Sequence, residues 1–500
     1  MAGTEAAATP GYDALVEVFG SLHRLSHLEG ILYWDRATYM PAGGSQARAE
    51  ALAELSVLAH RRRTDPALKG HLDRAAAEPL SEFQRASLRE MVRDWRRANA
   101  LPEALVHRRQ LATSRCEHAW RSQRPANDWT AFLTNFRDVV AIAREEARRL
   151  ADEMGVEPYD ALLDRYEPGM TSARLDELFG QMRGWLPALI AHGVESQKGL
   201  KLVEPTGPFP VDRQRRLCER VMEILGFDFN AGRLDVSIHP FCGGVPEDVR
   251  MTTRFSEQDF LGSLLGTIHE TGHGRYEQNR PRQWLGLPVS EARSMAIHES
   301  QSLFFEMQLA GHRGFAELLS PLLRQYFRDQ PAFAADNLHR LMTRVQPGLI
   351  RVEADELCYP AHIILRYEIE RPLIEGDIEV EDIPQLWDAK MAELLGVDTR
   401  GNHKDGSMQD MHWPEGAFGY FPCYSLGAMY AAQWAAAMRR ELSFDALIAS
   451  GDLASLFGWL KEHVWQSASR YETDDLARRA SGEALNPEHF RAHLTARYLA

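Results

Sequence analysis

One short motif restricts the fold of this chain more than any other feature. His269-Glu270-Thr271-Gly272-His273 has the form HExxH and follows an apolar run from Phe260 to Ile268. On a helix of ~100° per residue, the two histidines lie about 40° apart and one turn along, so both imidazoles face one side. A metal ion is the simplest partner for such a buried polar pair. The sequence therefore predicts a buried helix that carries a metal site.

The acidic residue inside this motif has a different direction and a different predicted role. Glu270 projects about 60° from the direction of His273 on a regular helix. Its carboxylate would then lie near a water at the metal without being required as a ligand. A carboxylate in that position suits a general base, and we predict this role for Glu270.

A catalytic zinc ion usually has three protein ligands and one open position, so a third ligand must lie elsewhere in the chain. The expected residue is Glu299, which shares a helix face with Met295 and Leu303. A carboxylate on that apolar face would lack a partner unless a cation lay beside it. A glutamate held in an ordinary salt bridge is the alternative. We predict that Glu299 completes the ligand set with His269 and His273.

Helical periodicity extends over most of the chain. Apolar residues recur at three- and four-residue spacing, whereas alternating strand patterns are scarce, so we predict a mainly α, large helical fold. We find no repeat and no clear domain boundary, and we expect a single domain over residues 1–500 with residues 1–10 disordered. The clearest expected helices contain Leu15 to Leu25 and, as arginine-rich segments, residues 83–98, 101–121 and 132–154.

The one strong β pattern directly precedes the HExxH helix. Leu234 to Ile238 and Val249 to Phe255 are rich in β-favouring residues, and the turn-rich Cys242-Gly243-Gly244 separates them. A small sheet beside the metal helix is therefore expected. Ser256, followed three residues later by an acid, resembles a capping box, and we expect the helix to begin at Phe260.

Composition excludes several classes of protein. Lys and Arg total 57 against 71 Asp and Glu, and a net charge of −14 opposes binding to nucleic acid or an anionic membrane. The longest apolar stretches, such as Tyr424 to Met438, are shorter than the ~18–20 residues of a membrane span. The first ten residues lack the pattern of a secretory signal. Together with five scattered cysteines outside any CxxC motif, these features predict a cytoplasmic protein with buried free thiols.

Several further motifs occur in a specific order, and together with HExxH they resemble the carboxypeptidase Taq family of metallocarboxypeptidases. The resemblance extends over nearly the whole chain, and its motifs are much more specific than HExxH alone. They are His239-Pro240-Phe241, Asp248 to Thr252 as DxRxT, His298-Glu299-Ser300-Gln301, Ile350 to Asp355 as IRxxAD, and Gly406 to Trp413 as GxxQDxHW.

The resemblance implies a helical zincin-type peptidase fold with an active-site groove, a homodimer, and one divalent metal ion per chain. Zinc is the expected ion and cobalt the alternative. The implied activity is broad release of C-terminal residues from peptides with a free C-terminus. Hydrolysis would use water activated by the metal, with Glu270 as the general base.

A carboxypeptidase must recognise a free terminal carboxylate, and a buried arginine is its natural forked partner. Arg351 and Arg250 are the candidates. Arg351 has an ordinary alternative role, because Asp355 lies four residues further on and could pair with it on a helix. Asp355 and Asp248 are also carboxylates that could orient a liganding imidazole.

The tetrahedral intermediate of peptide hydrolysis carries an oxyanion, and we expect a second hydrogen-bond donor for it besides the metal. His412, Tyr420 and His239 are the candidates. His412 and Tyr420 belong to a stretch from Gly406 to Tyr424 that is rich in Gly, Pro and aromatic residues and is expected to form a loop. For both, a packing role is the alternative.

Two other functions remain open at this point. A zinc oligoendopeptidase would use the same chemistry on internal bonds, and blocking a peptide's C-terminus by amidation would distinguish it from a carboxypeptidase. A helical binding protein with a structural metal belongs to a different class. Structural zinc sites, however, commonly have four ligands and are rich in cysteine, unlike this set.

Overall fold

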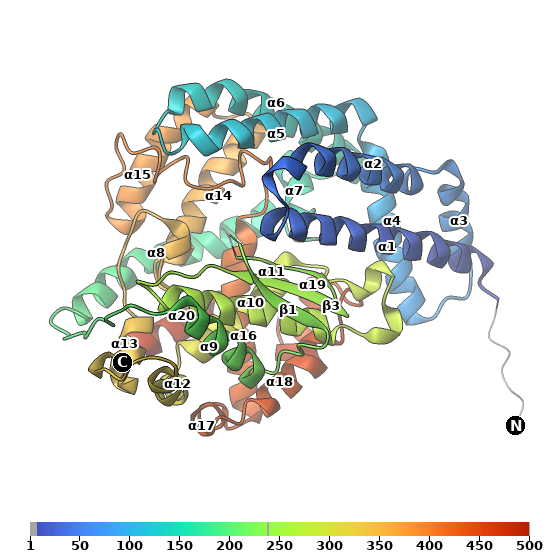
Figure 1. The fold of residues 1–500 in the computed structure, drawn as a ribbon. Coiled ribbons are helices and arrows are strands. Elements are labelled where there is room, and N and C mark those ends of the chain that lie inside the picture. The colour runs from blue at the N-terminus through green and yellow to red at the C-terminus, as the bar shows by residue number, and fades with distance from the viewer. Residues whose placement is uncertain (1–7, 238–239, 500) are drawn as a thin grey trace, which may run out of the picture.

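The computed structural model describes residues 8–237 and 240–499, and helices dominate the described part (Figure 1). The predicted mainly α class is confirmed. Because Pro10 already begins the first helix, the expected disorder of residues 1–10 is wrong at Pro10, and residues 1–7 lie outside the described part. The early helix is α1 (Pro10–Thr38), and the three arginine-rich helices are α4 (Glu82–Ala100), α5 (Glu103–Gln123) and α6 (Trp129–Met154).

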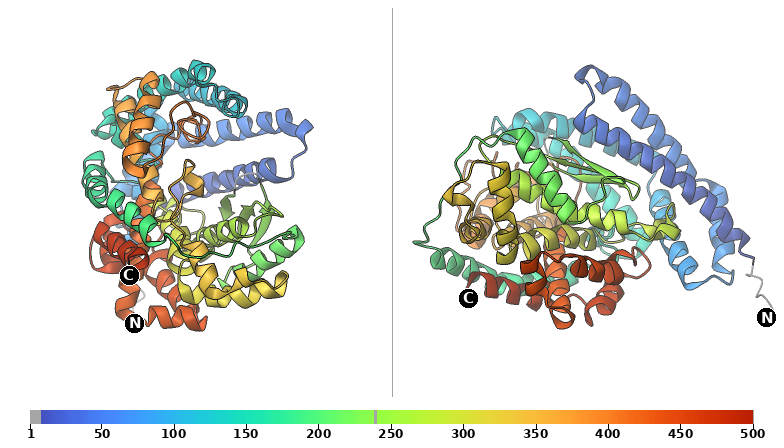
Figure 2. Two further views of the ribbon diagram at one scale, coloured as in Figure 1. Left: turned by 90° about the vertical axis from the view of Figure 1, so that its left-hand side faces the viewer. Right: turned by 60° about the horizontal axis from the view of Figure 1, so that its bottom comes forward.

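The N-terminal helices form a layer of their own with a separate small core. α1 and α2 (Ser45–Arg63) run antiparallel as a long pair at one side of the molecule, and α3 (Pro66–Ala76) and α4 pack with them (Figure 2). Trp34 of α1 lies between two guanidinium groups, with Arg233 and Arg250 at 5.2 and 4.3 Å from its ring centre. These contacts attach the N-terminal layer to the sheet.

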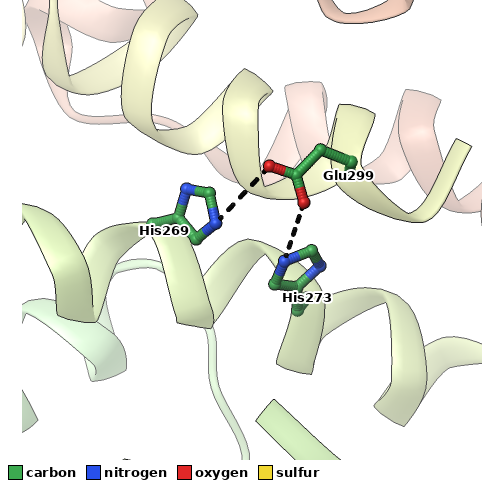
Figure 3. A group of neighbouring side chains, drawn as sticks. All are labelled: His269, His273 and Glu299. Atoms are coloured by element: carbon green, nitrogen blue, oxygen red, sulfur yellow. Dashed lines mark ion pairs between the residues drawn. The ribbon is translucent and has the colours of Figure 1, made fainter. Parts of the chain in front are cut away.

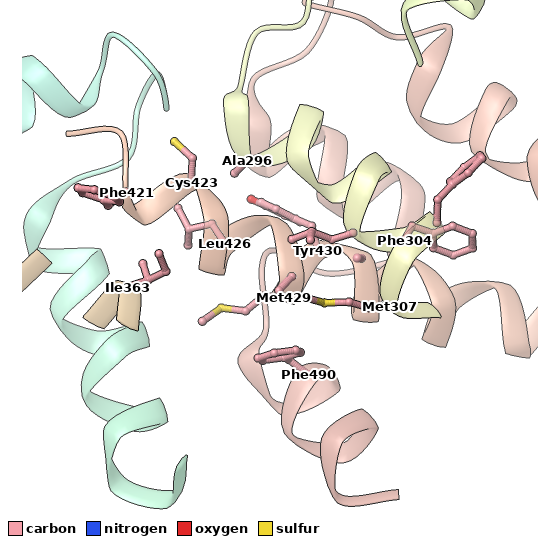
Figure 4. Close-up of a cluster of buried hydrophobic side chains, with 14 of the residues drawn as sticks. Ala296, Phe304, Met307, Ile363, Phe421, Cys423, Leu426, Met429, Tyr430 and Phe490 are labelled. Atoms are coloured by element: carbon pink, nitrogen blue, oxygen red, sulfur yellow. The ribbon is translucent and has the colours of Figure 1, made fainter. Parts of the chain in front are cut away.

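The main core surrounds one helix that is apolar on nearly every side, α16 (Pro422–Glu441). Its Leu426 and Tyr430 belong to the same buried cluster as Ala296 and Phe304 of the neighbouring helical segment (Figure 4). The other helices around this core are α7 (Pro158–Leu163), α8 (Ser172–Ser196), α9 (Val211–Ile224), α12 (Arg313–Tyr326), α13 (Ala335–Met342), α14 (Tyr359–Glu375), α15 (Ile383–Leu395), α17 (Phe444–Ser450), α18 (Ala454–Leu460), α19 (Thr473–Ser481) and α20 (Pro487–Tyr498).

The predicted small sheet is present and has three strands in the order β1-β3-β2. β1 (Gly232–Val236) pairs in parallel with β3 (Asp248–Thr253), and β2 (Cys242–Val245) pairs antiparallel with the other side of β3. The turn expected at Cys242-Gly243-Gly244 is therefore wrong, because these residues form an edge strand. Tertiary pairing with β3 overrides their weak strand propensity.

The HExxH helix is α10 (Leu261–Asn279), which packs against β2 and β3. The expected start at Phe260 is displaced by one residue, and Ser256 does not cap the helix. Asp259 takes that role, because its carboxylate accepts hydrogen bonds from the backbone N–H groups of Leu261 and Gly262 at 2.8 and 3.2 Å. An acid is favourable there because it satisfies free N–H groups at the positive end of the helix dipole.

The loop expected from Gly406 to Tyr424 is correct up to Phe421, since α16 begins at Pro422. Proline is well tolerated in the first turn of a helix, where its missing N–H group would have no partner. No helix among the described residues has the length and apolar character that crossing a bilayer requires.

Candidate metal centre

Two crossing helices bring the three predicted ligands together. α10 carries His269 and His273, and α11 (Met295–Leu303) carries Glu299, whose carboxylate points at both imidazoles (Figure 3). The helices approach closely at Gly272, where an added Cβ would lie 2.4 Å from the carbonyl oxygen of Gln301. A larger residue inside the HExxH motif would therefore force the two ligand-bearing helices apart.

The ligand atoms lie at distances that suit one cation. Nε2 of His269 is 3.7 Å from one carboxylate oxygen of Glu299, and Nε2 of His273 is 3.4 Å from the other. All three groups offer ligand atoms within 4.8 Å of one another. Tetrahedral zinc with bonds near 2.0–2.1 Å separates its ligand atoms by about 3.3 Å. The donor set and its spacing thus fit a zinc-type ion.

The carboxylate of the predicted ligand set is charged at neutral pH. Burial alone would raise the pKa of Glu299. His269 and His273 have the opposite and larger combined effect, so the pKa is lowered to about 2. Glu299 is therefore ionised at neutral pH and offers a carboxylate that can bind a metal without first losing a proton.

Glu270 is a neighbour of the three predicted ligands and is not part of the group whose atoms converge. It is buried, and its Oε2 has no hydrogen-bond partner within the described residues. Burial is the main cause that raises the pKa of Glu270 to about 7, with Glu299 adding to the effect and His269 opposing it. A carboxylate that titrates near neutrality and retains a free oxygen is able to accept and return a proton.

A carboxylate that was not predicted from the sequence contacts the first predicted ligand. Glu306 Oε2 lies 2.7 Å from Nδ1 of His269, so Nε2 of the same ring is left for the metal. Glu306 belongs to the π-helical turn η4 (Phe304–Ala310) that continues α11. Such turns are rare in proteins as a whole, but those that occur are frequently found at functional sites.

The second predicted histidine ligand, His273, is supported by stacking. The ring of His298 lies parallel to that of His273, with centroids 4.4 Å apart and planes inclined by 19°. His298 Nε2 is in turn 3.0 Å from the carboxylate of Glu277. His298 therefore packs on His273 and contacts Glu277.

The two aspartates considered as partners of an imidazole have other contacts, so neither orients a metal ligand. Asp248 forms a forked ion pair with Arg250, at 2.9 Å. Asp355 accepts backbone hydrogen bonds from Gln346, Leu357 and Cys358, at 2.9 to 3.0 Å. Glu306 contacts His269 instead. Glu306 lies seven residues after Glu299, which on a helix places it within about 20° of the same face. This spacing was the sequence signal that could have identified Glu306.

Arg351 is buried and paired, but not with Asp355. It lies in the short 3₁₀ turn η6 (Arg351–Glu353), where the helical spacing assumed for that pair does not apply. Its Nε donates to Asp410 at 2.9 Å, and its Nη1 donates to the hydroxyl of Tyr359 at 2.7 Å. Asp410 also binds Arg366 at 2.6 Å, so one carboxylate serves two buried guanidinium groups. Within the described residues, Nη2 of Arg351 makes no hydrogen bond.

A group of tyrosines connects Arg351 with the metal centre. The negative charge of Glu299 contributes to the raised pKa of Tyr359, Tyr420 and Tyr424, in each case after the larger effect of burial. The guanidinium carbon of Arg351 is 4.9 Å from the ring centre of Tyr424. Arg351 therefore lies in a cluster of aromatic side chains whose hydroxyl groups are influenced by the charge of Glu299, the predicted third ligand. Tyr359 and Tyr424 were not singled out from the sequence, and only proximity in the fold reveals them.

His412 and Tyr420 both belong to this cluster. Their ring centroids are 5.6 Å apart, and His412 Nε2 is 3.1 Å from the hydroxyl of Tyr424. Burial, followed by Arg351, lowers the pKa of His412 to about 3, so the imidazole is neutral at physiological pH. Its Nδ1 is buried without a partner in the described part of the chain. His239 lies outside the described residues.

Arg250 lies elsewhere, on β3. Its Nε and Nη2 are engaged by Asp248, and its guanidinium stacks on Trp34 of α1. Together with Trp34 and Cys242, it lines a cavity between α1 and β2. The structure therefore does not bring Arg250 into the aromatic cluster around Arg351.

Comparison with known proteins agrees with this geometry. The family model for the carboxypeptidase Taq (M32) metallopeptidases matches residues 14–498. The chain is 37% identical to thermostable carboxypeptidase 1 of Thermus thermophilus, with 98% of each chain covered. It is 35% identical to carboxypeptidase 1 of Bacillus subtilis, over 96% of this chain and 97% of the relative. Among solved structures, metallocarboxypeptidase 1 of Trypanosoma cruzi has 48% identity and a TM-score of 0.97, covering 99% of this chain and 100% of that one.

Proposed function

The chain belongs to the carboxypeptidase Taq (M32) family of metallopeptidases, and on that premise we propose that its catalytic centre is the site formed by His269, His273, Glu299 and Glu270. The protein is a metal-dependent carboxypeptidase that acts on peptides. An oligoendopeptidase activity is not favoured, since the named relatives are carboxypeptidases.

The observation that carries this proposal is the convergence of two imidazole nitrogens on the two oxygens of one buried carboxylate. His269, His273 and Glu299 would hold the ion and leave an open position for substrate. When bound, a zinc-type ion polarises a peptide carbonyl and lowers the pKa of water toward neutrality. We propose zinc as the ion and cobalt as the alternative, because imidazole and carboxylate donors suit both.

The protein side chains then perform the proton transfers and the recognition. Glu270 accepts the proton of the attacking water at its unpartnered Oε2 and returns it to the leaving amine. Tyr420 and the neutral His412 are donors for the carbonyl oxygen as it gains negative charge. Arg351, with Nη2 free of hydrogen bonds in the described structure, binds the terminal carboxylate of the peptide. Arg250 remains the second candidate for that role.

A matched pair of peptides tests the proposed function. One peptide has a free C-terminus, and the other has the same sequence with a C-terminal amide. We expect mass spectrometry to show residues leaving one at a time from the free acid, while the amide is spared. Rapid internal cleavage of both peptides would contradict the proposal.

We also propose that the protein is a cytoplasmic homodimer. The resemblance at the signature motifs supports the dimer, and five free cysteines support a reducing compartment. Light scattering of the purified chain tests the dimer directly, and a mass of one chain would contradict it.

A further inference from the structure

A second cavity with a distinct chemistry lies apart from the proposed metal ligands. Its volume is about 340 Å³, and it lies between α1, α4 and the segment of residues 286–293 that leads to α11. This volume is within the range of small-ligand sites. None of His269, His273 and Glu299 lines it.

The cavity wall is rich in guanidinium groups. Five arginines line it, together with His23, against only three carboxylates. The arginines are Arg63, Arg93, Arg97, Arg165 and Arg293, and the carboxylates are Glu90, Asp94 and Glu291. In a protein of net charge −14, this local excess of positive charge is opposite to the overall balance.

Two of the three carboxylates of the wall are paired with arginines, and the third faces a histidine. Glu90 is buried and forms ion pairs with Arg293 at 3.0 Å and with Arg93 at 3.6 Å. Asp94 pairs with Arg63 at 3.2 Å. Glu291 lies 3.8 Å from His23. None of these carboxylates forms an ion pair with Arg97 or Arg165.

The two remaining arginines therefore lack a full counter-charge. Asp164, next to the cavity, binds Arg97 at 3.0 Å but also binds Arg93 at 3.3 Å, so it is shared. Arg165 forms no ion pair within the described residues, and its guanidinium lies 5.6 Å from the ring centre of Tyr166. Burial, followed by the positive charge of Arg93, lowers the pKa of Arg97 to about 10 despite Asp164.

We propose that this cavity is an oxyanion-binding site, in which Arg97 and Arg165 bind a phosphate or carboxylate group. Guanidinium groups match both anions, because their planar N–H forks pair with two oxygens at once. Asp164 neutralises the positive charge of Arg97 only in part, because it is shared with Arg93. A bound anion would supply the remaining negative charge.

The oxyanion has two possible sources, a free anion or an acidic side chain of a bound peptide. Ser26 lines both this cavity and the one between α1 and β2, so the two are neighbours along α1. A peptide that lies along α1 over the cavity beside Arg250 would therefore approach the arginines.

The test measures anion binding to the metal-loaded enzyme by isothermal titration calorimetry at constant ionic strength. The probes are inorganic phosphate and acetyl-tetra-aspartate amide, with acetyl-tetra-asparagine amide as the uncharged reference. The variants are Arg165→Gln, Arg97→Gln and the double substitution. Arg96→Gln is the matched control, because Arg96 is exposed on the same helix and does not line the cavity.

We expect the wild type and Arg96→Gln to bind phosphate equally, and the double variant to bind at least about tenfold more weakly, since charged hydrogen bonds are lost. Phosphate binding alone would identify a free anion as the ligand. Binding of the aspartate peptide that is lost in the same variants would identify an acidic side chain.

Equal phosphate affinity in all variants, or no binding of either anion, would overturn the proposal. The single Arg165→Gln variant is expected to fold normally, because this exposed side chain contributes no ion pair in the described structure. It therefore keeps the test valid if the double variant misfolds. Melting curves in chloride alone establish that each variant is folded.

Discussion

Gly427 of α16 lies directly against Glu299 of α11, and a Cβ added at Gly427 would lie 2.8 Å from both Cβ and Cγ of Glu299. Real side chains do not pack that closely, so any larger residue at position 427 must displace Glu299 or the helix that carries it. The long apolar helix α16 therefore sets the position of the proposed third metal ligand.

Gly427→Ala is expected to weaken metal binding about tenfold or more, because a small shift of Glu299 moves one ligand out of place. Competition with a chelator measures the affinity. Gly458→Ala on α18 is the control, since an added Cβ there meets nothing within 4 Å. Wild-type affinity in a folded Gly427→Ala protein would show that the contact does not position Glu299.

Glu306→Gln tests the carboxylate that orients His269. The amide removes the negative charge that favours a ring with its proton on Nδ1, and we expect metal affinity to fall roughly 10- to 100-fold. The same chelator competition measures it. Glu317→Ala on α12, which removes an acid paired with exposed Arg313, should leave the affinity unchanged. If both variants bind metal equally well, Glu306 has no role in the centre.

Substitutions at the adjacent residues Glu299 and His298 test which of them binds the metal. Glu299→Ala should remove most of the metal, because two imidazoles alone hold zinc weakly. His298→Ala should retain it, since His298 stacks on His273 and contacts Glu277 and Tyr276 without belonging to the converging group. Elemental analysis after dialysis gives both metal contents. Equal loss in the two variants would leave the choice of Glu299 without support.

The sequence predicted features that depend on local pattern. The apolar spacing located α1, α4, α5 and α6, and the spacing of HExxH placed His269 and His273 on one helix face. Glu299 was predicted because a carboxylate on an apolar helix face needs a cation. In each case one segment of chain contained the whole signal.

The features that were missed depend on contacts between distant segments. Cys242 to Val245 form a strand only because β3 provides hydrogen-bond partners. Arg351 pairs with Asp410 rather than with the nearby Asp355, because Arg351 lies in a 3₁₀ turn and the loop that carries Asp410 folds onto it. Fifty-nine residues separate that pair, so spacing along the chain contained no signal for it.

Arg351→Ala tests recognition of the substrate's terminal carboxylate. We expect a loss in kcat/KM for free-acid peptides that corresponds to roughly 2–5 kcal/mol, because a desolvated charge pair is removed. Hydrolysis of the amidated peptide, already slow, should hardly change. Steady-state kinetics on both peptides provides the comparison.

Arg250→Ala is the matched comparison for this prediction, and a melting curve controls for folding, since Arg351 also pairs with buried Asp410. A purely structural role would reduce activity on both peptides in proportion to folded protein. Unchanged free-acid kinetics in Arg351→Ala, with a large loss in Arg250→Ala, would transfer the role to Arg250.

The most direct test of the proposed centre is the metal content of Glu270→Gln, measured together with its turnover of a free-acid peptide. Glu270 is proposed as the base and not as a ligand, and an amide at this position cannot accept the proton of the water. We predict metal content close to that of the wild type. We predict turnover lower by several orders of magnitude, because general base catalysis contributes about 10²- to 10⁴-fold to the rate. Loss of most of the metal, or retention of wild-type turnover, would contradict the assignment.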